Sequence, residues 1–281
     1  MTPCSHRLKT GDTQRRNHPN VSTTPERRVI ESLIDEKNAP VTAILPNTKV
    51  IKIGGQSVMD RGRSALFPLV DEIAQCAKDG FHLLLGAGGG TRARHAYQIG
   101  LDLEVPTGVM ARIGCAVPRQ NARMLQMLLA KHGGVYIMPD DFEKLPLYFR
   151  LGCIPVMSGM PPHEYWEKPS PGTRIPPNRT DAGVYLAAEA LGAPMCFFAK
   201  DEEGLFTDDP KKNPKAEFIP KIHVRELMKR DLDDLVVERS VLTYLDRAQS
   251  CKQIQIFNSL KPGNLTRALK GEHVGTIIYA D

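Results

Sequence analysis

A short run near residue 50 sets the strongest limit on the fold of this chain. Lys49–Ser57 reads Lys-Val-Ile-Lys-Ile-Gly-Gly-Gln-Ser, and its β-branched apolar residues predict a strand buried on both faces. Lys52 lies inside this strand, where an unpaired ammonium is costly to bury. At Gly54 and Gly55 the strand ends in backbone that a ligand can approach closely. A cation followed by free amides suits a phosphate group, although an ordinary strand-to-helix turn with a snorkelling lysine explains the run equally well.

A second glycine-rich loop repeats the pattern. Phe81–Leu85 is expected to form a buried strand, and Gly86–Thr91 follows it directly, ahead of a helix that carries Arg94. Unpaired amides and the helix dipole point the same way in such an arrangement, which predicts an anion cradle. The glycine spacing also resembles a dinucleotide fingerprint. However, the nearby acids Asp102 and Glu104 precede Val-Pro and do not end a second strand, which argues against nicotinamide binding.

Composition and charge narrow the class of protein. With 41% hydrophobic and 25% charged residues among 281, the chain is typical of globular proteins. A formal charge of +5, without a basic helix or an aromatic platform, argues against nucleic-acid binding. Six widely spaced cysteines without a CxxC pair indicate reduced thiols, and no apolar segment is long enough to span a bilayer. We therefore expect a cytoplasmic protein with no membrane partner.

The order of patterns along the chain predicts its domain organisation. Residues 1–46 are expected to form an N-terminal arm, either flexible or wrapped around a neighbouring subunit, because they begin polar, basic and interrupted by Gly and Pro. From 47 to 281, strand and helix patterns alternate. This alternation predicts one α/β domain, a three-layer α/β/α sandwich with an open, mostly parallel sheet.

Two loops of the second half are candidates for a functional role. Met160–Asp181 is rich in proline and contains Trp166, which predicts a structured loop. Its last residue, Asp181, is expected to be the N-cap of a helix over Ala182–Leu191, whether or not it also binds a ligand. Lys200–Pro210 is crowded with charge. Although charged runs are most often solvated turns, this one follows a predicted strand, at the edge where open α/β sheets bind ligands.

Five separated motifs resemble, in the same order, those of the amino acid kinase superfamily, and within it those of bacterial uridylate kinases. They are Lys52-Ile-Gly-Gly, Gly88-Gly-Gly-Thr91-x-x-Arg94, Arg179-Thr-Asp181-Ala, Glu203-Gly-Leu-Phe206-Thr-Asp-Asp209-Pro, and Asn258–Asn264 with Gly271–Thr276. The resemblance runs from about residue 48 to the C-terminus. It implies an open sheet of about eight strands between helices.

A further set of motifs resembles the molybdenum storage protein family, in particular its β-type subunits. They include the stretch from Val50 to Arg63, Ser158-Gly-Met-Pro-Pro with Trp166, Lys200-Asp-Glu-Glu-Gly-Leu, and Pro262-Gly-Asn-Leu-Thr-Arg-Ala-Leu. This resemblance implies an ATP-binding subunit of a hexameric cage that accumulates polyoxometalate clusters from molybdate or tungstate. Its partners would be like or related subunits, an α-type subunit among them.

The resemblance also implies a role for each matched residue. Lys52 and Asp181 would be the catalytic pair, with Asp181 near the transferred phosphate and able to help hold Mg²⁺, which prefers one or two carboxylates with phosphate oxygens. Among the other cofactor-binding positions, Gly54 and Gly55 would contact the ATP phosphates, with Gly89, Gly90 and Arg94 opposite them. Lys200, Phe206 and Asp209 would hold the adenosine end, and Glu203 would also bind the cofactor. Phosphoryl transfer needs cations around the γ-phosphate and little covalent help.

Departures from the uridylate kinase pattern lie on the acceptor side. The family's acceptor aspartate is absent from the aligned stretch, which begins at Gln120, and the proline-rich segment with Arg174 and Asn178 replaces its acceptor loop. Both changes argue against phosphorylation of uridylate. Glu203 stands where the family usually has the shorter aspartate. This difference leaves open whether the chain acts as a magnesium-dependent ATPase whose activity is coupled to oxometalate deposition. The alternatives are a uridylate kinase and a subunit that binds ATP only to stabilise the assembly.

The metal-binding residues of a storage cavity are harder to place by resemblance. His163, after the double proline, is the one residue of the cavity-facing segments able to coordinate a metal centre directly. A surface histidine explains it as well.

Overall fold

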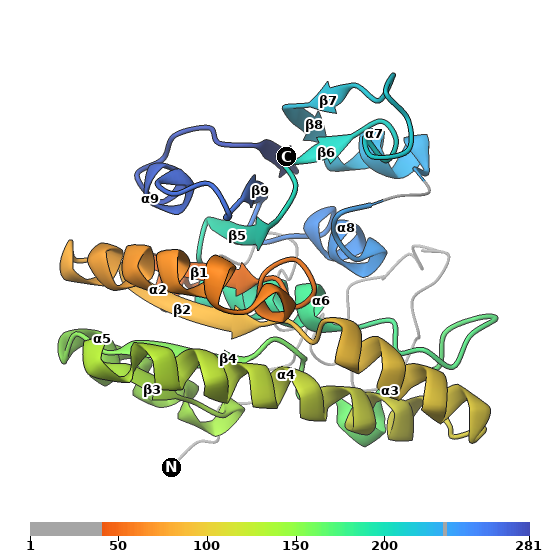
Figure 1. The fold of residues 1–281 in the computed structure, drawn as a ribbon, viewed down its shortest axis with the longest axis horizontal. Coiled ribbons are helices and arrows are strands. Elements are labelled where there is room, and N and C mark those ends of the chain that lie inside the picture. Colours follow the sequence, from red (N-terminus) through yellow and green to blue (C-terminus); the bar gives the residue numbers. More distant parts are fainter. Residues whose placement is uncertain (1–40, 233–234) are drawn as a thin grey trace, which may run out of the picture. The chain divides into compact units, whose positions relative to one another are not determined.

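An eight-stranded sheet forms the centre of the chain (Figure 1). The computed structural model describes residues 41–232 and 235–281. Its strands lie in the order β3-β4-β2-β1-β5-β9-β10-β8, and every neighbouring pair is parallel except β9 with β10. The predicted open and mostly parallel sheet is thus confirmed. The strands are β1 (Thr48–Ile53), β2 (His82–Ala87), β3 (Gly134–Tyr136), β4 (Ile154–Ser158), β5 (Met195–Lys200), β8 (Lys221–His223), β9 (Gln253–Asn258) and β10 (Thr276–Tyr279), with β6 (Leu205–Phe206) and β7 (Phe218–Ile219) in a separate antiparallel pair.

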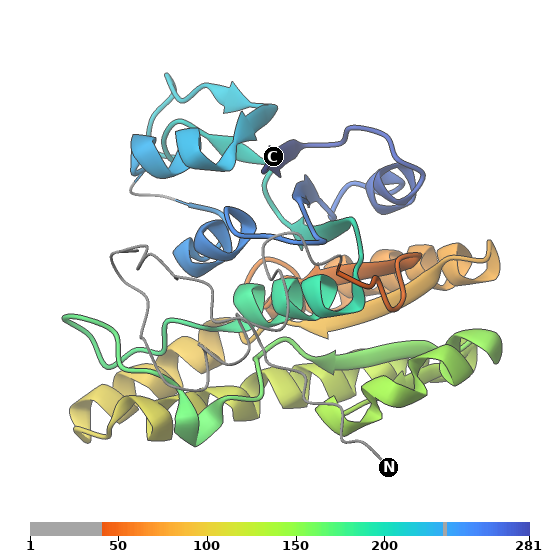
Figure 2. The same ribbon diagram turned by 180° about the vertical axis from the view of Figure 1, so that it is seen from behind.

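Helices cover both faces of the sheet, as the view from behind in Figure 2 also shows. The α-helices are α2 (Arg63–Lys78), α3 (Thr91–Asp102), α4 (Thr107–Leu129), α5 (Leu145–Arg150), α6 (Thr180–Leu191), α7 (Val224–Arg230), α8 (Arg239–Leu245) and α9 (Asn264–Leu269). Short 3₁₀ helices are η1 (Met59–Arg61), η2 (Ala130–His132), η3 (Pro139–Lys144) and η4 (Glu164–Trp166).

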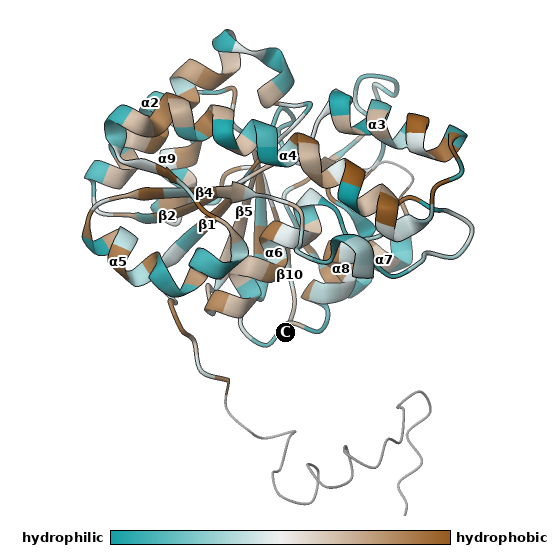
Figure 3. Ribbon diagram, turned by 90° about the horizontal axis from the view of Figure 1, so that it is seen from below, coloured by the Kyte–Doolittle hydropathy of each residue, from teal (hydrophilic) through white to brown (hydrophobic). Residues whose placement is uncertain are grey.

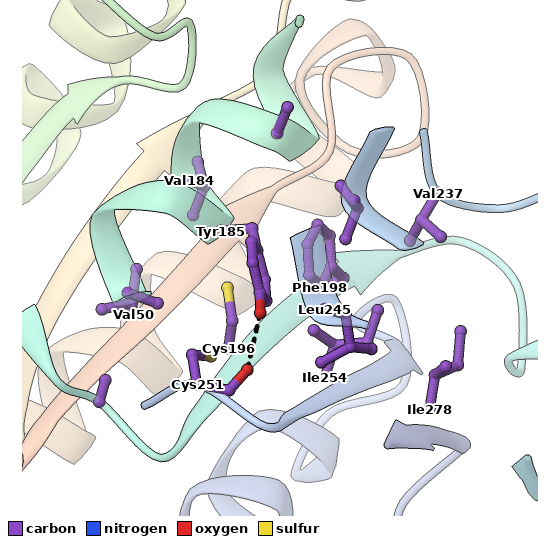
Figure 4. Close-up of a cluster of buried hydrophobic side chains, with 14 of the residues drawn as sticks. Val50, Val184, Tyr185, Cys196, Phe198, Val237, Leu245, Cys251, Ile254 and Ile278 are labelled. Carbon is purple, nitrogen blue, oxygen red and sulfur yellow. Dashed lines mark hydrogen bonds between the residues drawn. The ribbon is translucent and has the colours of Figure 1, made fainter. Parts of the chain in front are cut away.

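Alternate residues of the strands divide the core into two layers. Val50 of β1 packs with residues of α5, α6, α7 and α8, whereas its neighbour Ile51 packs with α2, α4 and α9. This is the period-two arrangement of a strand buried on both faces. Figure 3 shows the apolar strands lying between the two helix layers. In the first layer, Tyr185 is fully buried and its hydroxyl donates to the Cys251 carbonyl oxygen at 2.8 Å (Figure 4).

The bounds of two helices depend on contacts distant in the sequence. The helix α4 begins at Thr107 and continues through Pro118 to Leu129. A proline in a helix interior removes one hydrogen bond, and here the buried side of α4 retains the helix. The helix α8 ends at Leu245. It extends no further because Glu189 accepts the amides of residues 249–251, which a longer helix would have used.

The predicted arm over residues 1–46 lies outside the described residues as far as residue 40. It stays a prediction, as does the domain boundary at 47. Among the helices in the described part of the chain, none is long and apolar enough to cross a membrane.

Candidate functional site

The carboxyl ends of four parallel strands lie side by side and define the candidate site. In the register of the sheet, Ile53 of β1 pairs with Ala87 of β2 and with Ala199 of β5, and Ala87 pairs in turn with Ser158 of β4. The loops that follow these strands therefore emerge at one edge, the position at which open α/β sheets bind ligands. They surround a cleft of about 430 Å³.

The two glycine-rich loops contact each other backbone to backbone at this edge. The Gly88 amide donates to the Ile53 carbonyl oxygen at 2.9 Å. A Cβ atom on Gly55 would lie 2.1 Å from the Gly90 nitrogen, and one on Gly88 would lie 2.5 Å from the Gly55 nitrogen. Only glycine fits at such contacts. The predicted glycines thus bring the loops together, and Gly55, Gly89 and Gly90 line the cleft.

A buried triad of charges lies at the floor of the cleft. Lys52 Nζ lies 2.7 Å from Asp181 Oδ1, and Lys200 Nζ lies 3.0 Å from Asp181 Oδ2. Burial alone would raise the pKa of Asp181, but the ammonium groups of Lys200 and Lys52 outweigh it and hold this pKa well below its usual range. Burial lowers the pKa of Lys200 to about 8, against the opposing attraction of Asp181. The group carries two cations for one anion, so it favours an added negative charge.

The structure places Lys200 beside Lys52. The ammonium of Lys200 binds Asp181 alongside that of Lys52, and Lys200 lines the cleft. The reason is the parallel pairing of β1 with β5, because Lys200 is the last residue of β5 and extends from the same strand ends as Lys52. The role at the adenosine end, which the resemblance implies, stays a prediction.

Asp181 is not the N-cap of its helix, contrary to prediction. The N-cap of α6 is Arg179, whose side chain makes no capping hydrogen bond. Asp181 is the second helical residue, and Glu238 caps the helix from a distant segment. Its carboxylate accepts the amides of Arg179 at 3.0 Å, Asp181 at 3.1 Å and Ala182 at 3.2 Å. Sequence reasoning missed Glu238 because it stands 57 positions from Asp181 and belongs to no recognisable motif.

The N-terminus of α3 is also satisfied from within the chain. Asp60, in η1, accepts the Thr91 amide at 2.6 Å. The predicted anion cradle at this helix therefore has its first helical amide occupied by a carboxylate. The cationic residues that line the cleft are Lys52, Arg94, Arg179, Lys200 and Lys211, beside the backbone of the glycine loops.

Apolar residues also line the cleft. They are Phe206, Pro210 and the segment 235–237, and the charged Asp208, Asp209 and Lys211 line it with them. The aromatic ring and the aliphatic side chains of that segment provide a surface for stacking. The Asp209 carboxylate accepts the Lys211 amide at 2.9 Å, which shapes the turn.

Two predicted cofactor residues lie outside the lining of the cleft. Gly54 donates its amide to the Ala199 carbonyl oxygen at 3.0 Å, so it fixes the loop against β5. Glu203 accepts from Asn258 at 2.9 Å and pairs with Lys261 at 2.7 Å, and it faces a second surface hollow.

The residues on the acceptor side make structural contacts. Gln120 and Asn121 both accept from Arg92, and Asn121 also donates to the Gly88 carbonyl oxygen at 2.6 Å. Arg174 donates to the Leu101 carbonyl oxygen at 3.0 Å, and Asn178 bonds Glu167 and Tyr244. These contacts fix the glycine loop and the proline-rich loop in place.

His163 faces Glu167, with its Nδ1 atom 3.4 Å from Glu167 Oε2. It does not line the cleft. Residues 41–232 and 235–281 contain no group of three His, Cys, Asp or Glu side chains placed to hold a metal ion. A role for His163 as a ligand of a metal cluster stays a prediction.

Comparison with known proteins agrees with the fold and with the sequence motifs. Residues 47–257 match the model of the amino acid kinase family. The chain is 51% identical over 237 residues to the molybdenum storage protein subunit beta of Azotobacter vinelandii, covering 84% of this chain and 87% of that one. It is 28% identical over 235 residues to the uridylate kinase of Metallosphaera sedula, covering 82% and 97%.

Solved structures show the same fold at lower identity. The UMP kinase of Bacillus anthracis superimposes with a TM-score of 0.64 at 20% identity, covering 83% of this chain and 96% of that one. The uridylate kinase of Archaeoglobus fulgidus gives a TM-score of 0.61 at 24% identity, covering 82% and 99%.

Proposed function

The chain belongs to the amino acid kinase family, and we propose that it is an ATP-binding subunit of an assembly that stores molybdenum or tungsten as oxoanion clusters. The observation that carries this proposal is the 51% identity to a molybdenum storage protein subunit over 84% of the chain. The identity to uridylate kinases over a similar share of the chain is 28%.

The chemistry of the cleft supports ATP as the nucleotide. Lys52, Lys200 and Arg94 offer cations to a triphosphate, and the glycine loops bring backbone amides close to it. Phe206 and the segment 235–237 would hold the base. The cleft thus offers charged groups to phosphates and apolar groups to a base, as a nucleoside triphosphate requires.

The donor set also fits Mg²⁺ bound together with the phosphates. Asp181 is a buried carboxylate whose low pKa keeps it ionised, and it would hold the ion in place of a lysine contact. Asp201 and Glu202 at the rim provide further carboxylate oxygens. The bound ion would neutralise charge on the phosphate oxygens. The roles of this chain's residues are to bind the phosphates and to orient them.

A uridylate kinase is the second candidate, favoured by the similarity to enzymes of that name. Against it, the stretch that begins at Gln120 holds the glycine loop and presents no carboxylate to an acceptor. A coupled assay with ATP and a panel of nucleoside monophosphates separates the candidates. Turnover of uridylate would favour the kinase, and no turnover with any monophosphate would remove it.

The proposal includes assembly with like or related subunits, an α-type subunit among them. It also includes a hexameric state and a cytoplasmic location. Surface apolar side chains support subunit contacts. Trp166 is 84% exposed, and Tyr165, Ile99 and Leu103 are also exposed. Exposed large apolar residues near one another mark interaction sites.

Metal analysis of purified protein tests the storage function. The chain is produced in cells supplemented with molybdate, alone and with an α-type partner, and purified under ATP. We expect an assembly that carries molybdenum in large excess over one atom per chain. A metal-free monomer from both preparations would contradict the proposal.

A further inference from the structure

Glu238 is a buried carboxylate in the lining of the cleft that the proposed function does not use. Its side chain is 10% exposed. Burial raises the pKa of Glu238, and the nearby charge of Asp181 raises it further. A second carboxylate beside Asp181 is electrostatically unfavourable, and the Arg179 guanidinium, whose Nε lies 3.8 Å from Glu238 Oε1, offsets part of this cost.

The hydrogen bonds of Glu238 show what it holds. Its Oε1 atom accepts the Asp181 amide, and its Oε2 atom accepts the amides of Arg179 and Ala182. The first turn of α6, which carries Asp181, is thereby fixed by one side chain. A serine or asparagine at the N-cap satisfies such amides locally and at no like-charge cost. Here the cap comes instead from a segment 57 positions away.

That segment is itself a wall of the cleft. Residues 235–237 and Glu238 itself line the cleft. The same short stretch therefore contacts both the cleft and the backbone of Asp181.

We propose that Glu238 is a positioning residue, which holds the Asp181 carboxylate where Lys52, Lys200 and a phosphate-bound magnesium ion meet it. This inference rests on the proposed binding of Mg-ATP in the cleft. Glu238 acts through the backbone of Asp181, whose amide it accepts. Carboxylates that orient a metal ligand typically contribute about 10–100-fold to metal affinity.

The chain offers a matched control in Glu189. This glutamate also accepts three backbone amides, those of Gln249, Ser250 and Cys251, at distances from 2.7 Å. It belongs to the same helix as Asp181 but lies away from the lining of the cleft. A purely structural capping role would make the two glutamates equivalent.

The test measures ATP affinity by titration calorimetry with and without Mg²⁺, in the full chain and its variants. For Glu238→Ala we expect the gain in ATP affinity from Mg²⁺ to fall by about 10–100-fold. Glu238→Gln is expected to lie between Ala and wild type, because its one carbonyl oxygen retains the bonds of Oε2 while its amide group cannot accept from Asp181. Glu189→Ala and Glu189→Gln are expected to lower the melting temperature without changing the magnesium gain.

The outcomes separate this inference from the proposed function. A full magnesium gain in Glu238→Ala, or an equal loss in Glu189→Ala, would overturn the positioning role alone. If Glu238→Ala does not fold, Glu238→Gln decides, and a wild-type magnesium gain in that variant would overturn the role. A wild-type chain that binds no ATP would overturn the proposed function and the inference with it.

Discussion

At the scale of single residues, the site depends on one carboxylate shared by two lysines. Asp181 neutralises only part of the charge that Lys52 and Lys200 carry into a buried space. Buried charges are tolerated when they are paired. The arrangement thus leaves one positive charge in excess, which suits the phosphate binding that we propose.

Replacing Asp181 tests the strength of this pairing. Asp181→Asn would leave two buried ammonium groups without a counter-charge, and we expect the free energy of unfolding to fall by about 3–5 kcal/mol. Urea denaturation measures it. Asp246→Asn is the control, because Asp246 pairs with the exposed Arg225 and its loss is expected to change stability by less than about 1 kcal/mol. Equal effects of the two substitutions would contradict the role of the buried triad.

The pKa of Lys200 predicts a pH dependence. The folded chain lowers this pKa to about 8 from 10.5, so between these values the unfolded chain binds more protons at this residue. The contribution of Lys200 to the free energy of unfolding therefore rises with pH from about 8 to 10.5. Denaturation of the ligand-free wild type and of Lys200→Met at pH 7 and 9.5 isolates this contribution. We expect the free energy of unfolding of the wild type minus that of the variant to be larger at the higher pH. A constant or falling difference would show that the pKa of Lys200 is not lowered.

At the scale of elements, the site depends on parallel strands that end together. The register of β1, β2 and β5 places the two glycine loops in direct backbone contact. Space for the phosphates is therefore set by loop-to-loop packing as much as by any side chain.

A methyl group at Gly55 tests this packing. Its Cβ would lie 2.1 Å from the Gly90 nitrogen, so Gly55→Ala must push the loops apart. We expect a loss of about 1–3 kcal/mol of stability and a weaker affinity for ATP. Denaturation and calorimetry measure both, with Ser64→Ala, an exposed residue outside the lining of the cleft, as the control. Unchanged ATP affinity in Gly55→Ala would contradict the assigned position of the phosphates.

The same scale shows how far the sequence predicts this site. Lys52, the glycines and Asp181 were predictable because each belongs to a local motif at a strand or helix end. Glu238 and Asp60 were not predictable, because they lie 57 and 31 positions from the residues whose amides they accept. A single sequence does not show which distant side chain caps a helix. The sheet followed from alternating patterns, whereas the continuation of α4 through Pro118 depends on tertiary packing.

At the scale of the whole molecule, the exposed apolar surface indicates that the chain has partners. Trp166 belongs to η4, which Glu164 attaches to α4 through ion pairs with Arg112 and Arg119. A fixed loop that presents an exposed tryptophan is suited to a subunit interface.

Substitution of Trp166 tests this surface. We expect Trp166→Glu to lower the mass of the assembly in light scattering after gel filtration, because a charge would have to be buried in the interface. Trp166→Phe keeps an aromatic ring and is expected to retain the wild-type mass. A wild-type mass for Trp166→Glu would place the subunit contacts elsewhere.

An experimental structure of the chain with ATP, Mg²⁺ and molybdate tests the proposed site most directly. We expect the triphosphate between Gly55 and Gly90, in contact with Lys52 and Lys200, the base against residues 235–237, and no nucleotide on the acceptor side. A nucleotide bound away from the two glycine loops, or a uridine base beside Gln120, would contradict the proposal.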